Sequence, residues 1–183
     1  MELKEYLDKF ESKIEQELLR LCTNYKALDG TLLATDDIDG HWQVLAPEYM
    51  ADAVEQIRDY PTVSVAWAGY LGMAIAYGWD VVWNTISKAG YKSFYGEQGF
   101  DDMDEHIVRD ILLVPLDSME AKQIEEIIRQ CAQTVVNLIR REQIEPQSPT
   151  AFHVFARAVK VMYRIGAAIQ LKRMGYKFEK VNL

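Results

Sequence analysis

The longest apolar stretch of the chain predicts a buried helix. Seventeen residues from Val63 to Trp79 carry no charge, and their apolar side chains cover every face of a helix instead of one stripe. Such a helix is surrounded by protein or lies in a membrane. The stretch spans about 26 Å, which is short of the roughly 30 Å hydrocarbon layer of a bilayer, and Asp59 and Asp80 flank it closely. We therefore predict a helix over residues 62–87 at the centre of the protein.

One face of this stretch carries small side chains. Ala68, Gly72 and Ala76 are four residues apart, which places them on one side of a helix, and Gly69 and Gly78 add two more glycines. A glycine in a helix interior costs about 1 kcal/mol relative to alanine. We therefore expect another helix to pack closely against this face.

Outside this stretch the apolar residues fall into single stripes. Spacings of three and four residues predict amphipathic helices that bury one face. Helix-start signals such as Ser148 followed by Pro149 support their boundaries. The segments 26–46 and 89–100 lack this periodicity and are expected to be loops. The expected helices cover residues 3–24, 47–58, 101–114, 117–141 and 149–175.

The composition indicates one folded domain. Apolar residues make up 49% and charged residues 26% of the 183 residues, which is typical of globular proteins and too apolar for a disordered chain. Together with the periodicity, this predicts a single all-α domain over residues 1–183. We expect a bundle of about five or six helices around the central apolar helix.

The cysteines and the N-terminus bear on the cellular location. The first ten residues, MELKEYLDKF, mix charged with apolar residues, so no secretory signal is expected. Cys22 and Cys131 are the two cysteines of the chain, and each lies on the apolar stripe of an expected helix. Both are expected to be buried free thiols. These features predict a cytoplasmic protein that does not enter a membrane.

The charge is unevenly distributed. The formal net charge is −8, yet Glu179 is the single acidic residue after position 145, where seven basic residues lie. Residues 1–145 are therefore strongly acidic, and this acidic body argues against general nucleic-acid binding. Arg157, Lys160 and Arg164 form a basic stripe on the last helix and are candidates for binding an acidic partner. The alternative is that they pair with the acidic body of the same chain.

The end of the central helix is the best candidate for a ligand site. Polarity returns at Asp80 and Asn84, and an aromatic loop follows shortly afterwards. A partly desolvated carboxylate among aromatic rings can bind a cation or act as an acid or base. The alternative is an exposed polar stripe or an ion pair. The candidate ligand-binding residues are Tyr77, Trp79, Asp80, Trp83, Asn84, Tyr91 and Tyr95.

Two acidic segments carry weaker signals of metal or acid–base chemistry. Asp102 and His106 are four residues apart, so they share a helix face on which they could hold a metal or exchange a proton. The fragment TDDIDGHW resembles part of a calcium loop, but Ala46 occupies the position of the bidentate glutamate. Acidic residues are also expected at a helix N-terminus for electrostatic reasons. No metal site and no cofactor are predicted.

Three classes of function remain open. A non-enzymatic protein that binds another protein or its own copy is favoured, because no nucleophile motif or phosphate-binding loop is present. The second class is a small-molecule-binding protein with a pocket near Trp79, Asp80 and Trp83. The third is an enzyme that uses Asp80 or the pair formed by Asp102 and His106.

Overall fold

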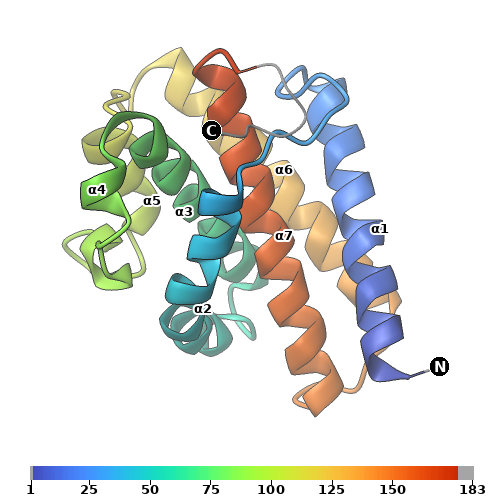
Figure 1. The fold of residues 1–183 in the computed structure, drawn as a ribbon. Helices are drawn as coiled ribbons and strands as arrows, with labels where there is room; N and C mark the ends of the chain where they lie inside the picture. Colours follow the sequence, from blue (N-terminus) through green and yellow to red (C-terminus); the bar gives the residue numbers. More distant parts are fainter. Residues whose placement is uncertain (1, 177–183) are drawn as a thin grey trace.

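The computed structural model describes residues 2–176, and these residues form an all-α bundle without a β-strand (Figure 1). Five helices are longer than twenty residues, and four short helical segments lie between the third and fourth of them. The long helices are α1 (Leu3–Asn24), α2 (Asp36–Gln56), α3 (Pro61–Val81), α6 (Met119–Arg141) and α7 (Pro149–Arg173). The short segments are α4 (Trp83–Ile86), η1 (Tyr91–Phe94), α5 (Met103–His106) and the π-helical η2 (Ile107–Ile111).

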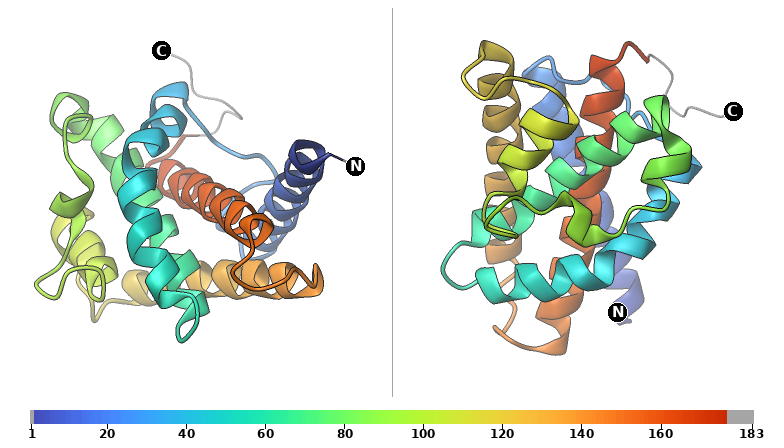
Figure 2. Two further views of the ribbon diagram at one scale, coloured as in Figure 1. Left: turned by 90° about the horizontal axis from the view of Figure 1, so that it is seen from below. Right: turned by 90° about the vertical axis from the view of Figure 1, so that its left-hand side faces the viewer.

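The interior of the bundle is built on the contact between α3 and α7, the most extensive contact between any two helices described. Figure 2 shows α7 running between α1, α2 and α6, and it contacts all three as well as α3. The apolar helix expected at the centre is therefore buried, and it shares the interior with the last long helix. None of the helices in residues 2–176 is long and apolar enough to cross a membrane.

Glycines bring α3 and α7 into backbone contact. A Cβ atom on Gly72 would overlap the carbonyl oxygen of Tyr163, and one on Gly166 would overlap the carbonyl oxygen of Gly69. The close packing expected from the small residues of α3 is thus present, and Gly166 of α7 completes it. The absence of side chains at this crossing lets the two apolar helices approach more closely than larger residues would permit.

The apolar helix ends earlier than expected. It stops at Val81 instead of residue 87, because the backbone of Val82 is not helical, with φ −144° and ψ 50°. The chain then makes one further helical turn, α4, and the side chain of Ile86 packs directly onto Gly78 of α3. This contact requires the chain to fold back, so a continuous helix to residue 87 is incompatible with it.

The second long helix begins earlier than expected. The lack of periodicity predicts a loop over residues 36–46, but α2 starts at Asp36 and contains Pro47 in its interior. Thr35 caps the helix because its hydroxyl oxygen accepts a hydrogen bond from the amide of Ile38 at 3.0 Å. Asp36, Asp37 and Asp39, a residue type that is also common in turns, lie in the first turn of α2, where negative charge is favourable.

Candidate functional site

Trp79 and Asp80 lie at the end of α3 and contact Tyr176. The ring of Trp79 is buried and lies 5.5 Å from the ring of Tyr176, centroid to centroid. The Tyr176 hydroxyl donates a hydrogen bond of 2.5 Å to the exposed carboxylate of Asp80. This hydrogen bond, followed by partial burial, raises the pKa of Tyr176. Asp80 thus belongs to a contact between α3 and the residues just after α7.

The next three predicted ligand residues point into different surroundings. Trp83 of α4 lies edge-on to His41 of α2, with ring centroids 5.9 Å apart. His41 is 6% exposed, and its Nε2 atom has no hydrogen-bond partner among residues 2–176. Burial lowers the pKa of this imidazole, which favours its neutral form. Tyr77 packs partly buried against the core, and Asn84 is exposed.

Tyr91 and Tyr95, the two predicted ligand residues of the aromatic loop, lie together, but they contact Asp52 instead of Asp80. The hydroxyls of Tyr91 and Tyr95 both donate to Oδ2 of Asp52 on α2, at 2.8 Å for Tyr91. Their rings are 5.3 Å apart. Burial, then the hydrogen bond to Asp52, raises the pKa of Tyr91, and the same causes raise the pKa of Tyr95 to about 12. Five of the seven predicted ligand residues are therefore divided among three separate contacts.

Asp102 and His106 are each engaged with other groups. Nδ1 of His106 lies 3.0 Å from Oδ2 of Asp110, one helical turn further along. Asp102 accepts a hydrogen bond of 3.0 Å from the amide of Gln98 and thereby closes the preceding loop. Asp104 lies between these two residues in the sequence, and burial raises the pKa of its carboxyl to about 6. Within residues 2–176, no three His, Cys, Asp or Glu side chains are grouped closely enough to hold a metal ion.

The basic stripe of α7 faces acidic side chains of the same chain. Arg157 pairs with Asp8 of α1 at 2.7 Å. Lys160 lies 3.6 Å from Glu11, also on α1. The remaining member of the stripe, Arg164, pairs with Glu15 of α1 at 2.7 Å and with Asp39 of α2 at 3.8 Å. These contacts match the intramolecular alternative that the charge distribution leaves open.

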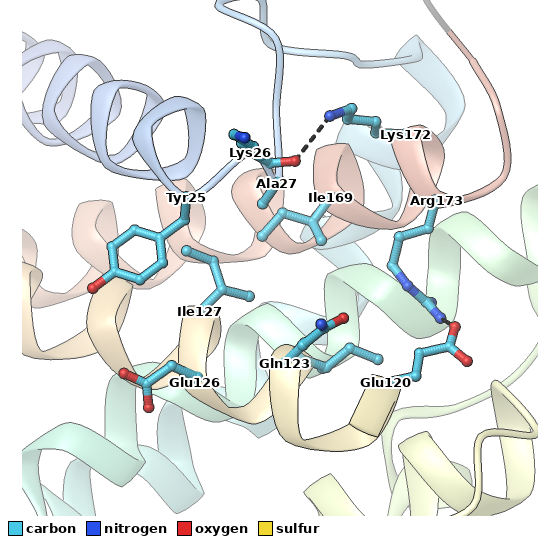
Figure 3. A pocket seen from close by; sticks show the side chains of 11 residues that line it. Tyr25, Lys26, Ala27, Glu120, Gln123, Glu126, Ile127, Ile169, Lys172 and Arg173 are labelled. Atoms are coloured by element: carbon cyan, nitrogen blue, oxygen red, sulfur yellow. Dashed lines mark hydrogen bonds and ion pairs between the residues drawn. The ribbon is translucent and has the colours of Figure 1, made fainter. Parts of the chain in front are cut away.

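A pocket lies at the end of the bundle where α1 and α7 end and α6 begins. Its volume is about 500 Å³, which is within the range of small-molecule sites. Figure 3 shows the side chains of Ile127 and Ile169 between Tyr25 on one side and Arg173 with Glu120 on the other. The lining residues are Tyr25, Lys26, Ala27, Glu120, Gln123, Ile124, Glu126, Ile127, Ile169, Lys172 and Arg173.

The floor of this pocket is apolar, and most charges at its rim are paired. Ile124, Ile127 and Ile169 are 2–6% exposed and belong to the core. Nζ of Lys172 lies 3.1 Å from Oδ1 of Asp29 and also donates to the carbonyl of Lys26. Arg173 pairs with Glu120, and Glu126 pairs with Arg129 at 2.7 Å. The charges at the rim are therefore largely compensated by ion pairs, and apolar side chains form the floor.

An exposed apolar segment adjoins the pocket. It comprises residues 113–119 and is called the 113–119 segment below. Leu113, Leu116 and Met119 within it are 69%, 37% and 70% exposed. Leu113 also has a left-handed backbone with φ +60°, which is unfavourable for a leucine. Met119 is four and seven residues before two lining residues of the pocket, Gln123 and Glu126, so all three share one face of α6.

No family model, curated protein or solved structure matches this chain. The pocket was not predicted from the sequence, because its residues come from α6, α7 and the segment just after α1, which are far apart in the chain. The 113–119 segment carried a detectable signal: three large apolar residues at a spacing of three, the last of which is the first residue of α6.

Proposed function

We propose that this protein acts by binding another protein through apolar contacts at the 113–119 segment and the adjoining pocket. The observation that carries the proposal is the exposure of Leu113 and Met119, at 69% and 70%. Contiguous exposed apolar surface is characteristic of interaction sites. The left-handed backbone of Leu113 adds an unfavourable conformation of order 1 kcal/mol, and such strain is often retained at functional sites.

The charges on the surface favour an apolar partner over an acidic one. The basic stripe of Arg157, Lys160 and Arg164 has carboxylates of α1 as neighbours. At the pocket rim, Lys172 and Arg173 are paired as well. A partner whose binding depended on these cations would first have to displace their present carboxylates. We therefore expect the partner to present an apolar helix or loop that inserts a side chain over the isoleucine floor.

Replacing Leu113 by asparagine, together with Met119 by lysine, is expected to abolish partner binding without loss of stability. Asparagine tolerates the left-handed conformation, and residue 119 is exposed. The measurement is co-purification from native lysate of the source organism at low and at high salt. The same partner should remain with the wild-type protein at high salt and be lost with the double variant.

The chain offers a matched control for this experiment. Gln147 is also exposed and left-handed, with φ +65°, so Gln147→Asn changes the backbone preference without removing an apolar side chain. It should retain the partner. Light scattering after size exclusion of the same variants distinguishes a second copy of the chain from a different protein. The proposal fails if the double variant keeps every partner, or if raised salt releases them all.

Small-molecule binding in the pocket is a second candidate function, favoured by the volume of about 500 Å³ and the apolar floor. Anilinonaphthalene sulfonate, a dye that fluoresces in apolar surroundings, is expected to bind there. Ala27→Phe would fill the pocket and remove the fluorescence gain. Ala51→Phe, on the exposed face of α2, serves as the control and should leave the signal unchanged. An equal signal in both variants would place the dye elsewhere and argue against this function.

An enzymatic role for Asp80, or for Asp102 and His106, has less support, because each of these side chains is engaged in a hydrogen bond within the chain. A cytoplasmic location remains part of the proposal. It is supported by the two free thiols of Cys22 and Cys131, since oxidising compartments favour disulfides.

A further inference from the structure

Two cysteines that are far apart in the sequence meet in the interior. Cys22 of α1 and Cys131 of α6 are separated by 109 residues, and their Sγ atoms are 3.5 Å apart. Both side chains are fully buried, with 0% exposure. They are the two cysteines of the whole chain. Burial alone is ordinary for a free cysteine, but direct contact between the two thiols is not needed to fill a core.

We propose that Cys22 and Cys131 are a redox-active pair that closes to an intramolecular disulfide joining α1 to α6. A disulfide bond is about 2.05 Å long, so the sulfurs have to approach each other by roughly 1.5 Å from their present contact. This approach requires the two side chains to rotate and α1 to shift relative to α6. The pair is reduced in the present structure.

The oxidant is a small disulfide such as oxidised glutathione. One cysteine loses its proton, and its thiolate attacks a sulfur of the oxidant, which releases one thiol and leaves a mixed disulfide. The second cysteine then attacks the protein sulfur of this mixed disulfide and releases the second thiol. Two electrons pass from the cysteine pair to the oxidant, and the two protons end on the released thiols.

Burial determines when this reaction occurs. The hydrogen bond with Cys22, followed by burial, raises the pKa of the Cys131 thiol, and thiolates are the reactive form. In the folded state the pair is therefore slow to oxidise, and a disulfide already formed is equally protected from reductants. In a reducing cytoplasm the pair stays as thiols. The disulfide would form only if an oxidant were present while the chain folds or while the helices around the pair open locally.

The position of the pair links it to the pocket. Cys22 is three residues before Tyr25, and Cys131 is four residues after Ile127, so the pair lies about one turn behind the pocket on both helices. Drawing α1 towards α6 would therefore shift the wall formed by Tyr25 against the floor formed by Ile127. This coupling rests on the proposed function of the pocket, whereas disulfide formation does not.

The test is to unfold the reduced full-length protein and refold it in oxidised glutathione. We expect the intact mass to fall by two hydrogen atoms, and digestion to yield one peptide pair that joins Cys22 to Cys131. The oxidised monomer should have a higher melting temperature than the reduced protein, because the link encloses more than a hundred residues. Cys22→Ser and Cys131→Ser should show no such mass loss and no oxidant-dependent rise.

During refolding the oxidant can reach both thiols. A negative result therefore cannot be explained by their burial in the folded protein. The proposal is overturned if both thiols stay titratable in denaturant after this refolding, or if the products are only glutathione adducts or linked dimers. Comparing partner or dye binding by the reduced and oxidised forms tests the coupling to the pocket separately. Equal binding by the reduced and oxidised forms would contradict the coupling to the pocket but not the formation of the disulfide.

Discussion

Gly166→Ala is expected to lower the free energy of unfolding by about 3 kcal/mol or to prevent folding. The added Cβ atom would overlap the carbonyl oxygen of Gly69. The atom in the way belongs to the backbone of a buried helix, so no side chain can rotate to relieve the overlap. The two helices would have to separate, and their separation would loosen the largest contact of the bundle.

The same argument applies from the other helix, because Gly72→Ala would place its Cβ atom against the carbonyl oxygen of Tyr163. The effect of either substitution is measured by urea unfolding followed by far-UV circular dichroism. Gly40→Ala is the matched control, since its Cβ atom would enter open space in α2. Alanine should stabilise that helix by up to about 1 kcal/mol. Equal stability of wild type and Gly166→Ala would show that α3 and α7 do not cross as closely as described.

Asp104→Asn is expected to stabilise the protein by about 1–2 kcal/mol near pH 8, with no gain near pH 3. Burial raises the pKa of the Asp104 carboxyl to about 6 from its usual value of 3.8. Below about pH 3.8 the carboxyl is protonated in both the folded and unfolded states, so it contributes nothing to the pH dependence. As the pH rises towards 6, the unfolded chain ionises first, and the folded state loses relative stability.

The expected gain is smaller than the full effect of the pKa shift because Asp104 is only partly buried. A shift of about two pKa units corresponds to about 3 kcal/mol in full, and water that still reaches the carboxyl reduces this figure. Asp110→Asn provides a control of opposite sign. Arg109 and then His106 lower the pKa of Asp110, so its charge stabilises the fold above its ordinary pKa and this stabilisation is lost as the pH falls. Urea unfolding across this pH range should therefore give opposite trends for the two variants.

The long helices were largely predictable from local pattern. Helix α1 was expected over residues 3–24 and occupies Leu3–Asn24, and α7 was expected from residue 149 and begins at Pro149. A single apolar stripe and an N-terminal cap depend on neighbours within a turn or two, so sequence alone reveals them. The aspartates around residue 36 were misleading, because the same side chains favour both turns and the first turn of a helix.

The candidate site was not predictable in the same way. Its pocket combines the end of α1, the first turns of α6 and the end of α7, and no local signal reports which helix ends will meet. Asp80 was expected to be the centre of a ligand site, yet Tyr176, almost a hundred residues later, donates to it. Tyr91 and Tyr95 were expected beside Asp80 and instead donate to Asp52.

The sequence by itself determined that this chain forms an all-α bundle and that the stretch from Val63 to Trp79 is buried. Apolar periodicity, the length of an uncharged stretch and helix caps each depend on residues close together in the sequence, so they can be recognised from the sequence alone. Only the tertiary structure decided that α3 shares the interior with α7, that Cys22 touches Cys131, and that Leu113 and Met119 stay exposed beside a pocket. These features depend on which surfaces cover one another, and that is set by packing between segments far apart in the sequence.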